Sequence, residues 1–547
     1  MTIEQELHDR ATRGQPLTAT EKAQLAAWYA HQDEIENKLI NSVKTPQTIE
    51  TPVEHRDVLI IGAGISGLGA ACHLQRECPQ KRYLILEGRD AIGGTWDLFR
   101  YPGIRSDSDL YTYGYDFKPW YGQPIATAAE ILRYLHEVVA ENGLAPHIRF
   151  GQRVLKATWS TSDALWTIET QNKDGETCYF TGNFLLMCQG YYNYEGGYRP
   201  HFPGEENFKG LIIHPQAWPE DLDYTGKRMV VIGSGATAAT IVPAVADQVA
   251  QVTQLQRSPS YYLPVDNREE DELTKQLRAL DVPKEWIHGI KLRKALAEGR
   301  VFTERALTEP DVVRQELLDM TAALLPKEYD IATHFTPRYD PWKERLCLLP
   351  EGDLLKAVAA GKASVVTDQI ESFVAEGILL QSGQVVEADI IVSATGIELC
   401  ATGNIAFAID DRPRQLADCW TYKGIMLSDV PNLVWIFCYI RSSWTLRSDL
   451  VAHYVCRLLN AMDAAGMRQC TPRLRPEDQA MTAKPFIDPA DFAPGYMRRG
   501  VGRLPKQGDR DPWINGQNYY TEKELLPHAS FNDGVLHLDN PIAYTSD

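Results

Sequence analysis

The segment Asp57–Gly67, which reads DVLIIGAGISG, decides the fold of this 547-residue chain. Its first five residues predict a buried parallel strand. The Gly-x-Gly-x-x-Gly pattern after them predicts a tight turn into a helix over Leu68–Gln75. A second strand is expected at Tyr83–Leu86, and it ends at Glu87. Strand, glycine-rich turn, helix and terminal acid form the complete context of a dinucleotide-binding unit.

The residues of this first unit suit a nucleotide. Glycines let the backbone approach a pyrophosphate, and a helix N-terminus offers free N–H groups and the positive end of its dipole. The carboxylate of Glu87 can accept hydrogen bonds from ribose hydroxyls. The pattern does not by itself distinguish FAD from NAD. The predicted contacts are Gly62, Gly64, Ser66, Gly67 and Glu87.

A second unit of the same kind begins at Lys227. Its strand is Met229–Ile232, and its turn is Gly233–Ala238, in which a small alanine replaces the third glycine. The next strand, Val252–Gln256, ends at Arg257, where the first unit has an acid. A guanidinium binds the 2′-phosphate of NADPH, whereas a carboxylate repels it. The alternative for Arg257 is a plain surface charge. The predicted NADPH contacts are Gly233, Gly235, Ala236, Thr237, Arg257 and Ser258.

A loop rich in glycine, aromatic and charged residues follows the first unit at Gly93–Asp107, GGTWDLFRYPGIRSD. This composition suits neither a core helix nor a core strand, and it predicts a loop shaped around a ligand. Asp107 is its candidate functional residue. The alternative is that Asp107 caps a helix expected over Asp109–Tyr115.

The stretch Phe208–Pro219, FKGLIIHPQAWP, lies between the two units. A segment in this position is well placed to join the units and to sense how they sit against each other. Its spaced residues are Phe208, Gly210, His214 and Trp218. The alternative for His214 is a buried structural histidine.

Two of these stretches resemble fingerprints of the type I Baeyer–Villiger monooxygenases. The first is Gly-Gly-x-Trp, then Tyr-Pro-Gly, then Asp, at Gly93–Asp107. The second is Phe-x-Gly-x-x-x-His-x-x-x-Trp-Pro at Phe208–Pro219. Members of this family are flavoenzymes that insert one oxygen atom beside a carbonyl. The resemblance implies that NADPH reduces FAD and that a flavin C4a-peroxide then converts a ketone to an ester or lactone.

The resemblance also implies roles for particular residues. The loop Gly93–Asp107 is expected over the flavin, with Asp107 in the active site. The stretch Phe208–Pro219 is expected to couple the position of NADP to flavin oxidation, so that His214 is not the catalytic base. The additional cofactor contacts that the resemblance implies are Gly94, Thr95, Trp96, Tyr101 and Asp107.

The segment Thr333–Cys347, THFTPRYDPWKERLC, resembles the loop that carries the active-site arginine of the family. Arg345 is the best match and Arg338 is its rival, and a surface ion pair is the alternative for both. A fixed guanidinium would stabilise a peroxyanion, and Asp107 could hold Arg345 in place. The wording Pro-Trp-x-x-Arg-Leu-Cys resembles the subgroup that contains the mycobacterial ethionamide-activating monooxygenase.

The predicted architecture is α/β, with two Rossmann-like dinucleotide-binding domains, for FAD and NADP, and a helical insertion. Residues 51–195 and 391–547 are assigned to the FAD domain, and residues 196–390 to the NADP domain with an insertion at about 267–335. Residues 1–50 are predicted to form a helical extension that is a packing arm, an oligomer contact or a wall of the substrate entrance. Its capping-box pair is Thr18 and Glu21, and a later strand is expected at Ser443–Leu446.

Composition narrows the partners. A net charge of −18 argues against nucleic acid or an anionic membrane as the main partner. Ten scattered cysteines without Cys-x-x-Cys spacing predict reduced thiols and no metal site. The N-terminus lacks the layout of a signal peptide, and no apolar run approaches the ~20 residues of a membrane span. We therefore expect a cytoplasmic enzyme whose oligomeric state the sequence leaves open.

Three other functions fit parts of the sequence. A monooxygenase of nitrogen or sulfur shares both glycine loops, but Trp218 and Asp107 oppose it. A disulfide reductase needs the absent Cys-x-x-Cys pair. A non-catalytic redox sensor does not need both Asp107 and Arg345. The expected substrates are O2 and an open-chain or aryl-alkyl ketone, with sulfide oxidation as a side activity.

Overall fold

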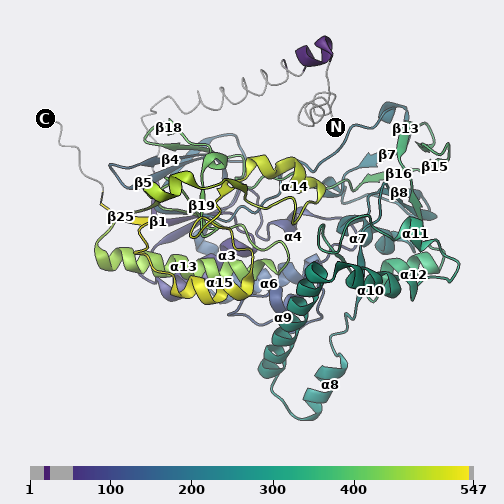
Figure 1. Ribbon diagram of the computed structural model, residues 1–547, viewed down its shortest axis with the longest axis horizontal. Coiled ribbons are helices and arrows are strands. Elements are labelled where there is room, and N and C mark those ends of the chain that lie inside the picture. Colours follow the sequence, from purple (N-terminus) through teal and green to yellow (C-terminus); the bar gives the residue numbers. More distant parts are fainter. Residues whose placement is uncertain (1–17, 25–26, 28–52, 541–547) are drawn as a thin grey trace.

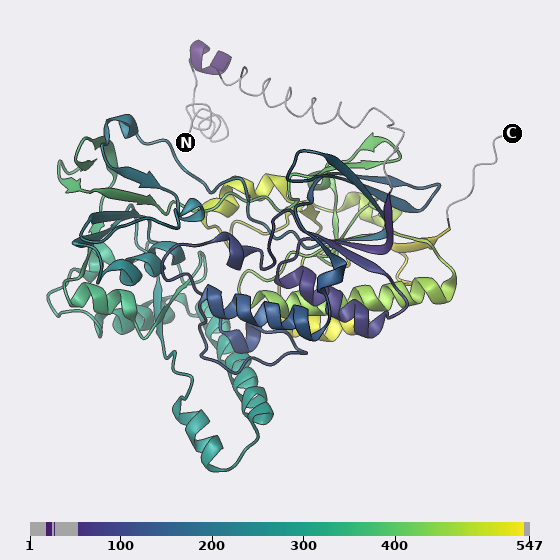
Figure 2. The same cartoon turned by 180° about the vertical axis from the view of Figure 1, so that it is seen from behind.

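The computed structural model describes residues 18–24, 27 and 53–540. Two lobes, each built on a largely parallel sheet, lie side by side, and a helical hairpin projects from the seam between them (Figures 1 and 2). This arrangement confirms the predicted α/β class with two dinucleotide-binding units and a helical insertion. In the part of the chain that the structure describes, no helix is long and apolar enough to cross a membrane.

The sheet of the first lobe has nine strands. Its parallel centre places β1 between β2 and β6, with Ile60 opposite Ile85 on one side and Leu186 on the other. Both faces of these strands are covered, which explains their continuous apolar sequences. The strands are β1 (Glu54–Ile61), β2 (Tyr83–Leu86), β3 (Ile148–Arg149), β4 (Arg153–Ser160), β5 (Leu165–Gln171), β6 (Thr177–Met187), β17 (Ala406–Ile409), β18 (Arg412–Pro413) and β21 (Leu433–Trp435).

Helices α3 (Ile65–Glu77), α6 (Ala128–Glu141) and α13 (Trp444–Ala465) pack in this lobe. Helix α6 begins with a capping box, in which Thr127 and Glu130 exchange hydrogen bonds between side chain and backbone N–H. The strand predicted at Ser443–Leu446 is wrong. Ser443 is the N-cap of α13, and a segment of four residues is too short for the helical period to show.

The sheet of the second lobe has five parallel strands in the order β12-β9-β8-β16-β7. The domain boundary placed at residue 391 falls inside β16, which pairs with β7 and β8, so the chain leaves this sheet only after Ser393. The strands are β7 (Leu211–Ile213), β8 (Arg228–Ile232), β9 (Gln251–Gln256), β12 (Ala363–Thr367) and β16 (Ile390–Ser393), with α7 (Ala236–Val245) and α12 (Asp353–Ala359) packed on them.

The predicted insertion contains α8 (Glu272–Ala279), α9 (Lys284–Thr308), α10 (Pro310–Ala322) and α11 (Ile331–His334). Most of α9 is exposed, as expected, and its buried residues are Ile287, Lys291 and Ala306. Its inner face reaches the first lobe, where His288 Nδ1 donates to the backbone oxygen of Trp120 at 2.9 Å. The insertion therefore belongs to the second lobe by sequence and contacts both lobes.

Shorter elements complete the structure. At the N-terminus, Thr18 and Glu21 exchange the hydrogen bonds of the predicted capping box. The rest of the predicted extension, apart from residues 18–24 and 27, lies outside the described residues. The remaining elements are α4 (Thr95–Leu98), α5 (Leu110–Tyr113), β10 (Tyr262–Val265), β11 (Cys347–Pro350), β13 (Ile370–Val374), β14 (Gly377–Leu380), β15 (Val385–Glu387), β19 (Thr421–Tyr422), β20 (Met426–Leu427), β22 (Gln469–Pro472), β23 (Lys484–Pro485), α14 (Gly495–Gly500), β24 (Lys506–Gln507), α15 (Tyr519–Leu525) and β25 (Leu536–Asp539).

Candidate active site between the two lobes

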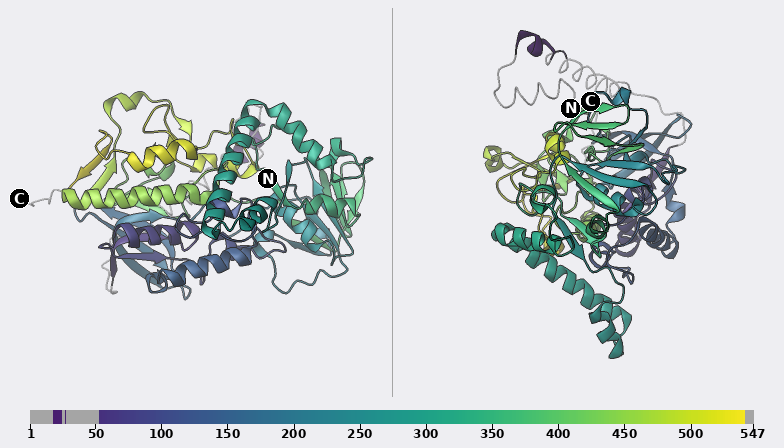
Figure 3. Two further views of the ribbon diagram at one scale, coloured as in Figure 1. Left: turned by 90° about the horizontal axis from the view of Figure 1, so that it is seen from below. Right: turned by 90° about the vertical axis from the view of Figure 1, so that its right-hand side faces the viewer.

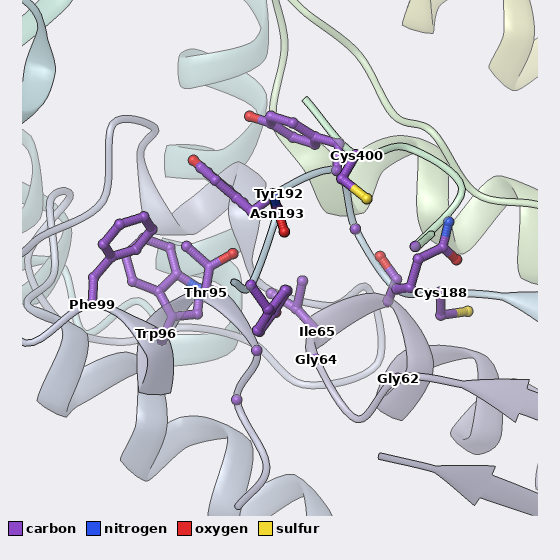
Figure 4. A pocket seen from close by; sticks show the side chains of 18 of the residues that line it. Gly62, Gly64, Ile65, Thr95, Trp96, Phe99, Cys188, Tyr192, Asn193 and Cys400 are labelled. Atoms are coloured by element: carbon purple, nitrogen blue, oxygen red, sulfur yellow. The ribbon is translucent and has the colours of Figure 1, made fainter. Parts of the chain in front are cut away.

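A cavity of about 440 Å³ is lined by residues of both lobes. Figure 4 shows Trp96 and Tyr192 on one side of the turn that holds Gly62 and Gly64. The sequence-predicted residues that line it are Gly62, Gly64, Ser66, Glu87, Gly94, Thr95, Trp96, Tyr101, Asp107, Ala236, Thr237 and Arg345. Those that the structure places outside its lining are Gly67, Gly233, Gly235, Arg257, Ser258, Phe208, Gly210, His214 and Trp218.

The first glycine-rich turn is held tightly. Gly62 has a φ of +102°, which favours glycine, and a Cβ there would meet the backbone oxygen of Cys188 at 2.8 Å. A Cβ on Gly67 would lie 1.9 Å from the oxygen of Gly62, so α3 approaches the turn as closely as a glycine allows. In the described structure no side chain caps α3, which leaves its first-turn N–H groups for a phosphate.

Glu87 closes the far side of this turn. Its side chain is buried, and its two oxygens accept hydrogen bonds from the backbone N–H of Ala63 at 2.7 Å and of Arg89 at 2.8 Å. Burial raises the pKa of Glu87, and the two N–H donors oppose that rise. Each carboxylate oxygen keeps a second lone pair, so Glu87 can still accept from ribose hydroxyls.

The loop Gly93–Asp107 starts in the first lobe and packs into the second. Leu98, Phe99 and Tyr101 are buried in the core of the second lobe. At Gly103, where φ is +76°, a Cβ would lie 2.7 Å from the Cβ of Ala244 in α7. The loop therefore fills the seam between the lobes, and its end at Asp107 faces the cavity.

Asp107 and Arg345 meet in this cavity, with 3.6 Å between the carboxylate and guanidinium atoms. Burial alone would lower the pKa of Arg345, but the carboxylate of Asp107 and the oxygens of Tyr496 and Tyr191 raise it well above its ordinary value. The helix-cap alternative for Asp107 fails, because Asp109 caps α5. Arg338, the rival of Arg345, is exposed and lies outside the cavity lining.

One wall of this cavity is aromatic and was not predicted from the sequence. Tyr191 and Tyr192 stack with ring centroids 4.8 Å apart, and Trp444 packs against Tyr191 at 5.4 Å. The run from Gln189 to Tyr198 is as rich in glycine and aromatic residues as the loop Gly93–Asp107, and it also follows a buried strand. That shared composition was the signal. Tyr496, which comes from α14, carried no such signal.

The second glycine-rich turn is more open. A Cβ on Gly233 would meet the oxygen of Ala394 at 2.4 Å, but a Cβ on Gly235 would meet no described atom within 4 Å apart from those of the adjoining residues. No side chain caps α7 in the described structure, as for α3. Arg257 is exposed just beyond the end of β9, and its positive charge opposes the rise that burial gives the pKa of Glu344. An exposed guanidinium at the end of this strand is open to a phosphate.

The stretch Phe208–Pro219 lies outside the cavity lining. Through His214 it contacts both segments that connect the lobes, one at Gly197 and the other at Gly396. His214 Nδ1 accepts a hydrogen bond from the N–H of Gln216, and Nε2 donates to the oxygen of Gly396 at 3.3 Å. The ring also lies where a Cβ on Gly197 would be, 2.0 Å from Cε1. Burial lowers the pKa of His214, which favours the neutral imidazole. Phe208 and Trp218 are buried in separate apolar clusters of the second lobe.

Two family models match the chain. The flavin-binding monooxygenase-like family matches residues 108–269, and the NAD(P)-binding Rossmann-like domain matches residues 60–116. Each covers less than half of the chain.

The chain is similar to curated proteins over nearly their whole length. The FAD-containing monooxygenase EthA of Mycolicibacterium smegmatis is 48% identical over 488 residues, which cover 88% of this chain and 97% of that protein. The probable FAD-binding monooxygenase AlmA of an Acinetobacter species is 45% identical and covers 88% and 95%. The crystal structure of cyclohexanone monooxygenase from Rhodococcus sp. Phi1 bound to NADP+ matches with a TM-score of 0.69 at 21% identity, over 89% of this chain and 100% of that one, which shows a shared fold.

Proposed function

The chain belongs to the FAD-containing monooxygenases, and from this premise we propose that it converts ketones to esters or lactones in a Baeyer–Villiger oxidation. Its cofactors are FAD and NADPH. The observation that carries the proposal is the ion pair between Asp107 and Arg345 in a cavity that both lobes line. The proposal includes an FAD domain built on the first lobe and an NADP domain built on the second. The chain returns from the NADP domain to the FAD domain after Ser393.

The first turn fits FAD. The uncapped N-terminus of α3 and the glycines before it would hold the pyrophosphate, and Glu87 would hold the ribose. The second turn, with open space at Gly235 and the guanidinium of Arg257, would hold NADPH. Bound FAD supplies the redox chemistry, because NADPH reduces it and the reduced flavin activates O2.

Arg345 places a permanent positive charge where negative charge develops on the reacting oxygen and on the substrate carbonyl. Asp107 forms an ion pair with the guanidinium and so helps to keep it turned into the cavity. The aromatic wall of Tyr191, Tyr192 and Trp444 keeps water away, which strengthens the electrostatic effect of Arg345. The neutral His214 contacts both segments that connect the lobes, and it therefore couples the positions of the two lobes.

The test compares Arg345→Ala with Arg338→Ala, because Arg338 is a nearby arginine outside the cavity. Each protein is reduced by NADPH without oxygen and then mixed with O2 and 2-dodecanone. We expect Arg345→Ala to reduce its flavin at a rate close to that of the wild type. Its ester formation should fall about 10²- to 10³-fold, since it has lost an electrostatic stabiliser of the reacting oxygen. Arg338→Ala should behave as the wild type does.

Full ester formation by Arg345→Ala would remove Arg345 from the mechanism. If the wild type also formed no ester, the proposed oxidation of ketones would itself be contradicted.

Sulfide oxygenation is the second candidate, and the match to the flavin-binding monooxygenase-like family favours it. The same cavity would serve both reactions, but an electrophilic oxygen that attacks sulfur does not need a cation that favours the anion. Sulfoxide formation from methyl phenyl sulfide should therefore persist in Arg345→Ala. If sulfoxide forms and ester does not in the wild type, heteroatom oxygenation is the main activity.

A further inference from the structure

Two histidines and three carboxylates gather outside the cavity, where α13 packs along α3. Figure 3 shows these two helices side by side. His73 and Glu77 come from α3, Asp449 and His453 from α13, and Asp116 from the turn after α5. We refer to these five residues as the α3–α13 cluster. None of them lines the candidate active site.

The two imidazole rings turn the same nitrogen toward one carboxylate oxygen. His73 Nδ1 lies 3.1 Å from Glu77 Oε1, and His453 Nδ1 lies 2.7 Å from that same atom. These three ligand atoms all lie within 4.8 Å of one another. Two nitrogens therefore converge on a single oxygen, an arrangement that either a shared cation or a proton on each nitrogen would satisfy.

The opposite nitrogens of both rings are held by the other two carboxylates. His73 Nε2 lies 3.3 Å from Asp449 Oδ1, and His453 Nε2 lies 3.3 Å from Asp116 Oδ2. A carboxylate that accepts from Nε2–H fixes the tautomer and directs the lone pair of Nδ1 toward Glu77. Histidines that bind metal ions are oriented in this way, with a carboxylate behind the ring.

The cluster combines a rigid base with an open side. The side chains of His73 and Asp449 are 2% and 11% exposed, whereas Glu77, His453 and Asp116 are 29%, 38% and 53% exposed. An ion can therefore enter from solvent and meet ligands that packing already holds in place. An entry path and an ordered outer layer of partners are both requirements for a metal site.

We propose that the α3–α13 cluster binds one divalent transition-metal ion of the zinc type through His73 Nδ1, Glu77 and His453 Nδ1. Two imidazoles and one carboxylate suit Zn²⁺ and Co²⁺, with a fourth position left for water. Metal–ligand distances of about 2.0–2.1 Å require ligand atoms about 3.3 Å apart. The 3.1 Å separation between His73 and Glu77 is close to this value, and the 2.7 Å separation between His453 and Glu77 would lengthen when the ion binds. Asp449 and Asp116 orient the two rings and do not bind the ion.

Such an ion would tie α3 to α13. Because α3 begins at the first glycine-rich turn, the bound ion would fix the helix whose N-terminus faces the phosphate site. The alternative is two protons in place of the ion, which make both rings cationic and bring the same two positive charges. The experiment has to separate a metal from these protons.

The test uses the full-length, untagged holoenzyme after dialysis against a chelator. Co²⁺ is added, and its visible absorption reports tetrahedral coordination by nitrogen and oxygen. Zn²⁺ bound after gel filtration is counted by mass spectrometry. We expect one ion per chain, and we expect Zn²⁺ but not Mg²⁺ to raise Tm, since nitrogen ligands select the former.

Matched variants assign the site. Glu77→Gln and His453→Asn, both at partly exposed positions, should lose the cobalt bands and bind Zn²⁺ at least tenfold more weakly. His136→Asn, which removes an exposed histidine of α6, should bind as the wild type does. Flavin content checks that each variant is folded. Absence of cobalt bands in the wild type, or the same bands in Glu77→Gln and His453→Asn, would overturn the proposal and assign the charge to protons.

Discussion

The two glycine-rich units share one plan but differ in how closely they are built. In the first unit, Gly67 leaves no room for a methyl group, whereas in the second unit Ala238 occupies the equivalent position and is fully buried. The first unit ends in the buried Glu87, and the second ends in the exposed Arg257. The nucleotide site of the first unit is therefore tightly enclosed, and that of the second unit is open to solvent. This difference suits a flavin that stays bound and a nicotinamide nucleotide that exchanges in each cycle.

The largest expected effect comes from making the first unit resemble the second. In Gly67→Ala the new methyl group meets a backbone oxygen, which cannot move aside as a side chain can. We expect the purified protein to lose most of its FAD, and the fold to lose about 1–3 kcal/mol. Absorbance of bound flavin and thermal unfolding measure the two effects.

Ala238→Gly is the matched control. It should cost about 0.5–1 kcal/mol, the usual penalty of a helical glycine, without loss of flavin. Equal flavin loss in both variants would show that the two turns are equally constrained.

The next effect concerns nucleotide choice. Arg257→Ala should lower kcat/KM for NADPH about 10- to 100-fold, because hydrogen bonds to a charged group are worth about 1.5–3 kcal/mol. The value for NADH should change little, since NADH has no 2′-phosphate. Steady-state kinetics with both nucleotides give the ratio. Arg293→Ala removes an exposed arginine from α9 and should leave the ratio unchanged. A parallel fall with both nucleotides would contradict recognition of the phosphate.

The smallest effect is a difference in acid response. In the second unit, hydrogen bonds from Arg228 lower the pKa of Asp389 to about 2. A lowered carboxyl pKa stabilises the fold above the unfolded value of ~3.9, and this stability is lost as the pH falls toward 2. In the first unit burial raises the pKa of Glu87, so the ionised form of Glu87 opposes folding at neutral pH.

Asp389→Asn checks this difference. Because Asp389 is 38% exposed, we expect a loss of only about 1 kcal/mol or less at pH 7. Thermal unfolding should show the variant and the wild type converging between pH 4 and 2. A gap that stays constant over that range would mean that the ion pair with Arg228 does not carry the effect.

The two units could be predicted from sequence because each is a local pattern. Strand, turn and helix follow one another within about 30 residues, and the glycines mark the positions where a backbone approaches closely. The meeting of Asp107 and Arg345 could be expected only from the family resemblance. These residues are far apart in the chain, and no spacing rule brings them together.

The positions of other site residues could not be predicted from the sequence, because they depend on tertiary packing. Tyr496 reaches Arg345 because α14 folds back across the seam, and that path depends on tertiary packing. The lobe to which a strand belongs is equally hard to predict, because it too depends on tertiary packing. An apolar strand such as β16 reads alike in either lobe, so residue 391 was assigned to the wrong sheet. The strand predicted at Ser443–Leu446 was wrong because an N-cap followed by three residues is too short a pattern to reveal a helix.

The loop Gly93–Asp107 has a consequence for anyone who builds chimeric enzymes from this chain. By sequence it belongs to the first lobe, but Phe99 and Tyr101 are part of the second lobe's core, and Gly103 lies against Ala244. In a chimera joined at the segments that connect the lobes, this loop would pack against a helix from another protein in place of α7. An exchange of the second lobe should therefore carry residues 93–107 with it, so that the graft follows packing and not the order of the chain.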